Sequence, residues 1–343
     1  MQKVGILGAG QLGRMLLQEA YNYPVEVHIM DKDDSYPAAG LCAYFHPGDI
    51  QSYDDVMAFG SGLDVLTIEI EHVNLDALYA LHEKGVKVIP SPDALKTIKN
   101  KILQKDFYSN LKIPTADYHV VHDLSGFHAL ELAFPLVQKS ATGGYDGKGV
   151  QVLKSAADLD HFFEGSSVIE SVVDIRKEIA VTVAIGQDGS HAIYPAVEMV
   201  FDPKLNLLDF QQCPADLDQQ ASSDAARLAL QVATQLGSPG LFAVEMFVDQ
   251  QGRVWVNETA PRVHNSGHHT IEAHFSSQFD MLWRILLAYP LGNTEMIMPS
   301  VMVNILGAEG YSGAADYVGL NEVLASADTF VHLYGKTDTK PGR

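Results

Sequence analysis

The feature that most constrains this sequence is a strand, glycine turn and helix at its amino terminus. Residues 3–13 read KVGILGAGQLG, an apolar run followed by glycines at positions 8, 10 and 13, and the helical pattern RMLLQEA comes next. Glycines at this spacing let backbone N–H groups at the start of a helix approach an anion closely. Asp31 lies where an acid would hold a ribose in a dinucleotide-binding fold. The pattern indicates a phosphate-binding turn, with NAD as one candidate ligand.

Short β-rich runs alternate with amphipathic helices over the first third of the chain. The runs VGILGAG, VEVHIMD, DVLTIEIE and KVIP are separated by LGRMLLQEAY and NLDALYALHEKG, in which apolar residues recur every three or four positions. One further helix is predicted to start at the Ser91-Pro92 cap and to continue to Leu111. This alternation predicts a parallel α/β sheet, and we expect a first domain over residues 1–112.

The remaining two thirds of the chain divide into two further units. Residues 113–172 carry two β-rich pieces around a glycine-rich loop, and their length suits a small lid subdomain. Residues 173–343 contain longer strands with hairpin turns at 187–189 and 249–252, and one helix. This second pattern is typical of an α+β domain built on antiparallel strands. We therefore expect three domains that pack around a shared cleft.

The composition excludes several classes of function. In 343 residues, 23 Lys and Arg against 43 Asp and Glu give a formal net charge of −20, which repels nucleic acid and acidic membrane surfaces. The two cysteines, Cys42 and Cys213, suit a reducing cytoplasm and exclude a disulfide scaffold or a cysteine zinc cluster. No apolar run reaches the ~18 residues of a membrane span. We expect a cytoplasmic protein that binds neither nucleic acid nor membranes.

A second glycine loop, TGGYDGKG over residues 142–149, is a candidate polyphosphate site. Its four glycines expose backbone N–H groups that can form an anion nest, and Lys139 and Lys148 flank them. A plain hairpin turn is the alternative, although such a turn needs fewer glycines. The loop is not a P-loop, because the G-K-[ST] ending is absent.

Two acids on the predicted hairpin LFAVEMFVDQQGRVWVNETAPR form a candidate metal site. With the turn centred between Gln250 and Gln251, Glu245 lies opposite Val256 and diagonal to Glu258, about 7–8 Å away on the same face. Like charges at this separation favour a hard cation between them, and oxygen ligands beside a phosphate suit Mg²⁺. Two solvated acids on a wet sheet face are the alternative interpretation.

The segment TAPRVHNSGHHT, which follows Glu258, is dense in polar residues. Arg262 presents a planar fork to carboxylate or phosphate, and histidines can move protons near neutral pH. The histidines at 264, 268 and 269 do not match a zinc pattern, and H-E-x-x-H is absent. Together, the two glycine loops, the acid pair and this polar loop imply ATP, magnesium and a small anion.

Three segments resemble one known family. GILGAGQLGRML, TGGYDGKG and EMFV…NETAPRVHNSGH are similar to the ATP-grasp N5-carboxyaminoimidazole ribonucleotide synthetases of de novo purine synthesis, and the resemblance covers essentially the whole chain. APRVHNSGH is its most specific piece, since related ATP-grasp ligases carry a different sequence there. The resemblance implies an N-terminal Rossmann-like (pre-ATP-grasp) domain, a small lid and a C-terminal ATP-grasp domain, commonly assembled as a homodimer.

The resemblance also implies an ATP site between the lid and the third domain. The residues that it assigns to ATP are Lys101, Lys139, Gly144, Tyr145, Asp146, Gly147, Lys148, Gly149, Glu170, Ser171, Val172, Val173, Glu178, Asn257 and Glu258. Glu245 and Glu258 would bind Mg²⁺. The residues that it assigns to catalysis are Arg262, His264 and Asn265, with Tyr145 and Asp146 next to the aminoimidazole.

The family resemblance implies that the amino-terminal glycine turn binds the ribonucleotide substrate. By resemblance, Gly10, Gln11 and Leu12 would face the 5′-phosphate side of aminoimidazole ribonucleotide, and Glu69 and Glu71 would approach its ribose or base. No nicotinamide is then expected. The implied reaction forms carboxyphosphate from bicarbonate and ATP, and the carboxyl group then passes to the exocyclic amine of the ribonucleotide.

Two features depart from the family pattern. Phe201 stands where many members have a nucleotide-contacting His, and the chain ends at YGKTDTKPGR, so we expect a shortened carboxyl-terminal segment. Lys336, Lys340 and Arg343 are the remaining candidates for contact with the substrate phosphate. The alternatives are another ATP-grasp ligase, such as a formate-using glycinamide ribonucleotide transformylase, an NAD dehydrogenase and a non-catalytic nucleotide-binding module.

Overall fold

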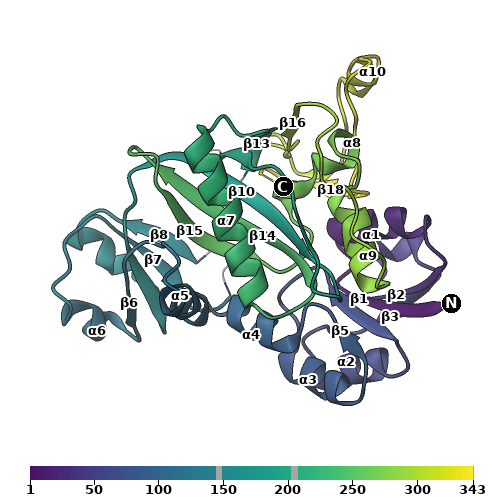
Figure 1. Ribbon diagram of the computed structural model, residues 1–343, viewed down its shortest axis with the longest axis horizontal. Helices are drawn as coiled ribbons and strands as arrows, with labels where there is room; N and C mark the ends of the chain where they lie inside the picture. Colours follow the sequence, from purple (N-terminus) through teal and green to yellow (C-terminus); the bar gives the residue numbers. More distant parts are fainter. Residues whose placement is uncertain (144–148, 202–207, 343) are drawn as a thin grey trace.

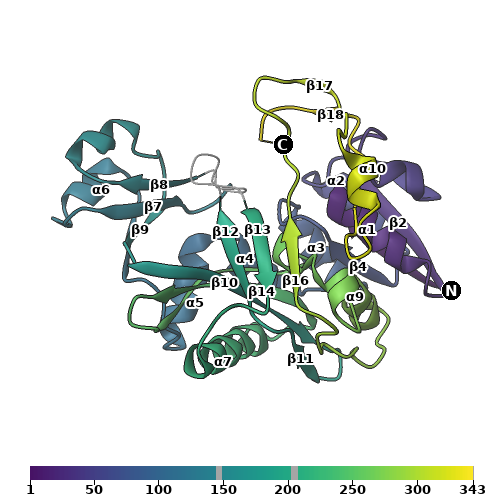
Figure 2. The same cartoon turned by 90° about the horizontal axis from the view of Figure 1, so that it is seen from above.

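The computed structural model describes residues 1–143, 149–201 and 208–342 (Figure 1). It contains three larger sheets, and a two-stranded pair of β17 (Gly313–Ala314) and β18 (Asp338–Thr339) lies near the carboxyl terminus. Figure 2 shows a four-stranded sheet at one end of the molecule and a five-stranded sheet at the other, with the seven-stranded sheet between them. No helix in the described part of the chain is long and apolar enough to cross a membrane.

The amino-terminal sheet is parallel throughout, as predicted, with the order β3-β2-β1-β4-β5. Its strands are β1 (Gln2–Leu7), β2 (Val25–Asp31), β3 (Tyr44–Pro47), β4 (Val65–Ile68) and β5 (Lys87–Val88). Its helices are α1 (Gln11–Ala20), α2 (Tyr53–Gly60) and α3 (Leu75–Glu83). The carboxyl ends of β1 and β4 are adjacent, so the glycine turn after β1 lies next to Glu69, which follows β4.

The single helix predicted after Ser91 is wrong. The chain forms two helices, α4 (Pro92–Lys99) and α5 (Lys101–Asn110), separated at Asn100, whose backbone is extended at φ −118° and ψ 114°. The Asn100 side chain accepts the N–H groups of Ile102 at 2.9 Å and Leu103 at 3.2 Å, which makes it the cap of α5. Asn satisfies free helix donors well, and here that preference outweighs the continuous apolar spacing on which the prediction rested.

The four-stranded sheet is antiparallel, with the order β6-β9-β7-β8. Its strands are β6 (Tyr118–Val121), β7 (Leu136–Ser140), β8 (Val150–Leu153) and β9 (Ser167–Ser171), and the short helix α6 (Leu124–His128) covers it. Its core is small and centres on Phe127 and Ile169. This core is separate from the clusters of the two larger sheets.

The seven-stranded sheet has the order β15-β14-β10-β12-β13-β16, with β11 paired to β10, and these strands pair antiparallel, as predicted. Its strands are β10 (Ile175–Ile185), β11 (His191–Ile193), β12 (Val197–Phe201), β13 (Leu208–Cys213), β14 (Gly240–Asp249), β15 (Val254–Ala260) and β16 (Ser300–Val303). The helix α7 (Gln219–Gln235) packs an alanine-rich face against this sheet. The helices α8 (Thr270–Ala273), α9 (Gln278–Leu286) and α10 (Leu320–Leu324) follow the hairpin in sequence.

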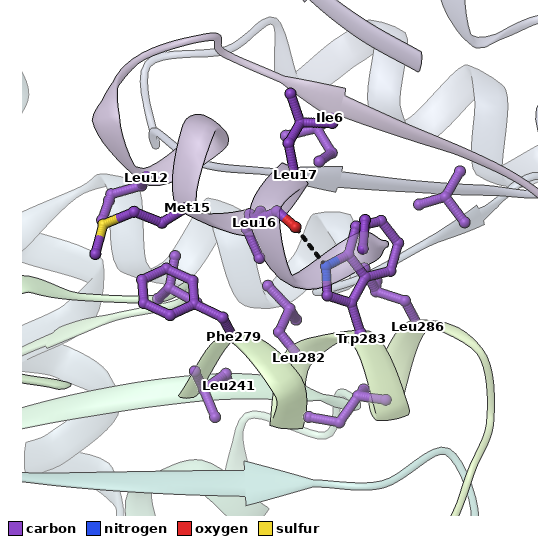
Figure 3. Packing of buried hydrophobic residues seen from close by; sticks show 14 of the residues in the cluster. Ile6, Leu12, Met15, Leu16, Leu17, Leu241, Phe279, Leu282, Trp283 and Leu286 are labelled. Carbon is purple, nitrogen blue, oxygen red and sulfur yellow. Dashed lines mark hydrogen bonds between the residues drawn. The ribbon is translucent and has the colours of Figure 1, made fainter. Parts of the chain in front are cut away.

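One core cluster joins the first sheet to the third. Figure 3 shows α1 packed against α9, with Leu16 and Leu17 beside Leu282 and Trp283. The Trp283 indole Nε1 donates a hydrogen bond to the Leu16 carbonyl at 2.8 Å, and the Trp283 side chain is fully buried. Because this contact is apolar and continuous, the amino-terminal turn is held at a fixed place relative to the hairpin β14/β15.

Replacing Trp283 with Ala is expected to lower the free energy of unfolding by about 3–5 kcal/mol, because it leaves a large cavity between α1 and α9. The measurement is urea denaturation followed by circular dichroism. Tyr21→Ala, which truncates an aromatic residue 80% exposed just after α1, is the control and should cost less than about 1 kcal/mol. Equal losses in the two variants would contradict this account of the core.

Asp249 anchors the β14/β15 turn. Burial alone would raise its pKa, but hydrogen bonds from Trp255 and Arg253 side chains and from backbone N–H groups outweigh burial and lower the pKa to about 2. The unfolded value is about 3.9. Between these pH values the unfolded chain binds more protons, so this stabilisation is present above pH ~4 and is lost as the pH falls toward 2.

Asp249→Asn should therefore lower the free energy of unfolding at pH 7 by about 1–3 kcal/mol. The difference in free energy of unfolding between the variant and the parent protein should become smaller below pH ~4. Urea denaturation at a series of pH values measures both effects. Asp328→Asn, at an exposed position after α10, is the control and should change stability little. If the difference in free energy of unfolding between the two proteins does not change with pH, the carboxylate charge is not what stabilises the turn.

Candidate active site

The two acids of the predicted metal site meet at a β-bulge in the hairpin β14/β15. Met246 pairs with Val256, but Glu245 pairs directly with Glu258, so Asn257 is an extra residue in β15. The predicted diagonal arrangement is therefore wrong for two reasons. The pairs Val248–Val254 and Met246–Val256 centre the turn on Gln251, which shifts the register by one residue, and the bulge shifts it by one more. Directly opposed residues have Cβ atoms about 4.5–5.5 Å apart, so this register brings the acids closer together than predicted.

Lysines from two different segments surround this pair. Lys101, at the start of α5, places Nζ 2.5 Å from Glu258 Oε2. Lys139, on β7, donates to Asn257 Oδ1 at 2.7 Å and lies 3.0 Å from Glu170 Oε2. The hydrogen bond from Lys139 to Asn257 thus connects the four-stranded sheet to the hairpin across a common cleft.

A third lysine in this network escaped the sequence analysis. Lys105 Nζ lies 3.0 Å from Glu170 Oε1 and donates to Thr115 Oγ1 at 2.6 Å. Burial lowers the pKa of Lys105 to about 8, although Glu170 opposes this shift. Lys105 is one helical turn after Lys101, and this spacing of two lysines on α5 was the signal that could have revealed it.

The two acids titrate as a pair. Burial raises the pKa of Glu245, and the charge of Glu258 raises it further. Lys101 lowers the pKa of Glu258 despite its burial. Both remain accessible to small ligands, with side-chain exposures of 17% for Glu245 and 39% for Glu258. A divalent cation between the acids would favour the ionised form of both, so the residues present fit the predicted Mg²⁺.

The polar loop after β15 is organised by Gln278, a fully buried residue that the sequence analysis did not select. Its Oε1 accepts the His264 N–H at 2.9 Å, and its Nε2 donates to the His264 carbonyl at 2.8 Å and lies 3.1 Å from His268 Nδ1. A Cβ at Gly267 would lie 2.3 Å from Gln278 Oε1. Only glycine therefore fits at this position, which explains one residue of the HNSGH motif in physical terms.

His264 faces the acid pair as a neutral imidazole. Burial lowers its pKa to about 4, and its Nε2 lies 3.5 Å from Glu245 Oε1. Its Nδ1 accepts the Ser266 N–H at 3.3 Å, so the neutral ring carries its proton on Nε2. His264 can therefore donate a hydrogen bond to an anion beside Glu245. The neighbouring Asn265 Oδ1 is buried and has no hydrogen-bond partner among the described residues.

Arg262 connects this loop to the amino-terminal domain. Its Nε lies 2.9 Å from Glu71 Oε1, and its Nη1 donates to the Val263 carbonyl at 3.0 Å. Glu71 follows β4 of the first sheet, so the predicted catalytic loop and the predicted substrate residues lie side by side. The ion pair is partly exposed and leaves the remaining guanidinium donors available to a ligand.

The amino-terminal glycine turn is occupied by protein carboxylates. Glu69 accepts the N–H groups of Gly10 at 2.6 Å and Gly13 at 2.9 Å, and Asp31 accepts the N–H of Ala9 at 2.7 Å. A Cβ at Gly10 would lie 2.8 Å from Glu69 Oε1, so this glycine is required for an internal contact. Since Asp31 is buried and engaged with backbone, it is not placed to hold the ribose of NAD.

Two amides of the turn remain free. Among the described residues, the N–H groups of Gln11 and Leu12 at the start of α1 donate to no protein acceptor. Arg14, one turn further along the helix, has a buried Nε without a hydrogen-bond partner and was missed by the sequence analysis. It is the only cation on α1, which was the available signal. These groups form a local anion-binding surface at a helix amino terminus.

The carboxyl-terminal segment closes over this surface. A Cβ at Gly335 would lie 2.7 Å from Arg14 Nη1, so the segment passes directly against α1. Lys336 Nζ lies 5.9 Å from the centre of the Tyr334 ring, and that ring is 6.1 Å from the His268 ring. Of the predicted phosphate contacts, Lys336 therefore directly follows residues that contact α1 and the HNSGH loop. Lys340 is exposed and contributes its backbone near Gly307.

The other predicted site residues are distributed as follows. Ser171 ends β9, Val172 and Val173 lie between β9 and β10, and Glu178 on β10 is close enough to raise the pKa of Glu245. Phe201 ends β12 and packs against the apolar cluster around Met199. Gly149 accepts the Ser140 N–H at 2.8 Å. Six predicted site residues lie outside the described residues: Gly144, Tyr145, Asp146, Gly147, Lys148 and Arg343.

Family models match most of the chain. A ribonucleotide synthetase preATP-grasp domain matches residues 1–99, an ATP-grasp domain matches residues 106–279, and a phosphoribosylaminoimidazole carboxylase C-terminal domain matches residues 300–343. These matches confirm the fold class that the sequence predicted. They cover both the glycine turn and the bulged hairpin.

Relatives of known function cover the full chain. The N5-carboxyaminoimidazole ribonucleotide synthase of Synechococcus elongatus is 32% identical over 100% of this chain and 88% of its own length. The synthase of Mycobacterium tuberculosis is 35% identical over 99% of this chain and 81% of its own length. The chloroplastic phosphoribosylaminoimidazole carboxylase of Vigna aconitifolia is 33% identical, and the chain spans 62% of that longer protein.

Solved structures agree with this assignment. The N5-carboxyaminoimidazole ribonucleotide synthetase of Thermotoga maritima superposes with a TM-score of 0.91 at 38% identity, covering 100% of this chain and 91% of that chain. The synthase of Aspergillus clavatus, solved with ADP and 5-aminoimidazole ribonucleotide, gives a TM-score of 0.89 at 32% identity and the same coverage. The chain therefore belongs to the N5-carboxyaminoimidazole ribonucleotide synthase family of ATP-grasp ligases.

Proposed function

We propose that this protein uses ATP and bicarbonate to carboxylate the exocyclic amine of 5-aminoimidazole ribonucleotide, giving N5-carboxyaminoimidazole ribonucleotide in purine biosynthesis. The observation that carries the proposal is the direct opposition of Glu245 and Glu258 beside Lys101 and Lys139. This arrangement suits a metal-bound triphosphate, and the Arg262–Glu71 ion pair connects it to a second anion-binding surface. Two such surfaces on one cleft suit a reaction that joins two anionic substrates.

The ATP half of the site lies between the four-stranded sheet and the hairpin. Lys101 and Lys139 would contact phosphate oxygens, which compete with the carboxylate and amide oxygens that these lysines now hold. Glu245 and Glu258 would hold Mg²⁺, which when bound offsets the negative charge of the triphosphate. Glu170 keeps both Lys105 and Lys139 oriented toward the cleft.

The bicarbonate would bind beside Arg262 and His264. The guanidinium of Arg262 offers paired donors to a carboxylate, and the Nε2–H of His264 donates from the side of Glu245. Donors fixed in advance in this way stabilise charge as it develops on the carboxyphosphate oxygens. Carboxyphosphate is labile in water, so the reaction requires that water be excluded from the site. The glycine loop to which this role falls by resemblance lies, from Gly144 to Lys148, outside the described residues.

The ribonucleotide would bind on the amino-terminal side. Its phosphate would take the free N–H groups of Gln11 and Leu12, with Arg14 and Lys336 as cations. Glu69 already holds two amides of the turn, so its role is to shape the turn while Glu71 and Arg262 face the base. This arrangement directs the exocyclic amine toward the carboxyl donor at Arg262.

The proposal includes a homodimer in the cytoplasm. β16 is an edge strand of the seven-stranded sheet, and its side chains Val301 and Val303 are 63% and 60% exposed. Alternate residues of a strand share a face, so these valines form an apolar surface that suits a second copy of the chain. The free thiols of Cys42 and Cys213 support a reducing compartment.

Glu245→Gln should reduce bicarbonate-dependent phosphate release from ATP by at least about 100-fold, because it removes one of two charged oxygen ligands of the metal. Phosphate release is measured with ATP, Mg²⁺ and bicarbonate, with and without aminoimidazole ribonucleotide. Glu198→Gln removes a carboxylate of the same sheet that pairs with Lys177 outside the site, and it should retain turnover.

The same assay can reject the proposal. Unchanged turnover in a folded Glu245→Gln protein would remove Glu245 from the metal site. Turnover that depends on formate and not on aminoimidazole ribonucleotide would instead support a formate-using ATP-grasp ligase.

Arg14→Gln should raise the KM for aminoimidazole ribonucleotide by about tenfold or more, since one charge-assisted contact to the phosphate is lost. The KM for ATP should not change, because Arg14 lies on the amino-terminal side of the cleft. Steady-state kinetics with each substrate varied in turn measures the two KM values separately. Arg227→Gln, on the exposed side of α7, is the control. An equal rise in both KM values would place Arg14 outside the phosphate site.

A further inference from the structure

A second group of metal-binding residue types lies outside the site described above. Cys213 ends β13, and His269 and His274 flank the short helix α8 on its two sides. One ligand atom from each of the three residues lies within 4.8 Å of the others. The residues come from segments 56 positions apart in sequence, so no local spacing motif could have revealed the group.

All three side chains are buried, with exposures of 2% for Cys213, 7% for His269 and 3% for His274. Both ring nitrogens of His274 and Nε2 of His269 have no hydrogen-bond partner among the described residues. Tyr194 does not supply one, because its ring meets His274 edge-on and its hydroxyl donates to the Ser276 carbonyl at 2.9 Å. Buried ring nitrogens without partners are unfavourable, so one nitrogen of each ring is expected to contact a ligand in the native protein.

One hydrogen bond fixes the orientation of a candidate ligand. Gln211 Nε2 lies 3.1 Å from His269 Nδ1, which orients that ring and leaves its Nε2 for a ligand. A metal binds the neutral imidazole through its lone pair and binds Cys as the thiolate.

We propose that Cys213, His269 and His274 bind one Zn²⁺ ion. One sulfur and two imidazole nitrogens are a donor set that Zn²⁺ prefers over the hard cations Mg²⁺ and Ca²⁺. On binding, a Zn–S bond forms, the S–H bond breaks and the proton passes to solvent, with no change of oxidation state. The remaining coordination position of a tetrahedral ion would be taken by water.

The site would be structural. Its ligands are buried, and Cys213 belongs to an apolar cluster with Met199, against which Met296 and Met302 pack, so a substrate has no evident path to the ion. Zn²⁺ there would attach β13 to the segment that directly follows the HNSGH loop. This would hold His264 and Asn265 in place relative to the sheet. The proposal does not depend on the proposed enzyme activity, because none of the three ligands was assigned to it.

The test uses the full-length protein after removal of bound metals, titrated with Co²⁺ alone and then with Zn²⁺. Tetrahedral Co²⁺ bound to a thiolate gives intense visible bands and a sulfur-to-metal charge-transfer band, which carboxylates such as Glu245 and Glu258 cannot produce. We expect this band to saturate at about one equivalent, Zn²⁺ to displace it and excess Mg²⁺ to leave it unchanged. Zn²⁺ should also raise the melting temperature of the parent protein.

Two cysteine variants make the readout specific. Cys213→Ser should lose the charge-transfer band and the Zn²⁺-dependent rise in melting temperature, whereas Cys42→Ser, which changes the other thiol, should retain both. His274→Gln keeps the thiol and serves as a second variant if Cys213→Ser does not fold. Absence of the band in the folded parent protein, or its presence in Cys213→Ser, would overturn the proposal and leave three neutral buried groups that contact one another.

Discussion

The structure depends on the direct opposition of two glutamates in a bulged hairpin. Placing Glu245 and Glu258 face to face is unfavourable unless positive charge lies close by, and Lys101 supplies it at 2.5 Å. Lys101 itself is positioned by the break at Asn100, where its N–H donates to the Ala141 carbonyl at 2.8 Å. The acid pair therefore needs positive charge close by, and this need connects the hairpin to the helices α4 and α5 and to the four-stranded sheet.

The parts of the chain around this acid pair are held in place in two different ways. The α1–α9 core and the Gln278 hydrogen bonds fix the glycine turn and the HNSGH loop relative to the hairpin. The four-stranded sheet, by contrast, has a small core of its own and reaches the cleft through lysine contacts. Contacts of this polar kind can exchange with phosphate oxygens, as the proposed ATP site requires.

Much of the fold could be predicted from the sequence because its signals are local. The parallel sheet followed from alternating strand and helix periods, and the hairpins followed from turn residues at 187–189 and 249–252. The bulge at Asn257 and the helix break at Asn100 were missed, since each depends on a side-chain contact that no periodicity records. Asn100 is a typical helix cap, but the continuous apolar spacing on both sides of it favoured a single helix.

The candidate site was predictable where chemistry is concentrated in one segment. The acids and the HNSGH loop were found in this way, and the family resemblance added residues from the lid. Lys105, Arg14 and Gln278 were missed because a single lysine, arginine or glutamine on a helix is usually solvated. The glycine turn was predicted to bind an anion, but in this structure a protein carboxylate, Glu69, takes two of its amides. Only tertiary structure could reveal that internal ligand.

A crystal structure of the protein with Mg²⁺ and ADP would test the proposed metal site directly. We expect a metal ion held between Glu245 and Glu258, with nucleotide phosphates against Lys101 and Lys139. This expectation would be contradicted by a structure in which the two carboxylates point away from each other, or in which the nucleotide lies against residues 8–13.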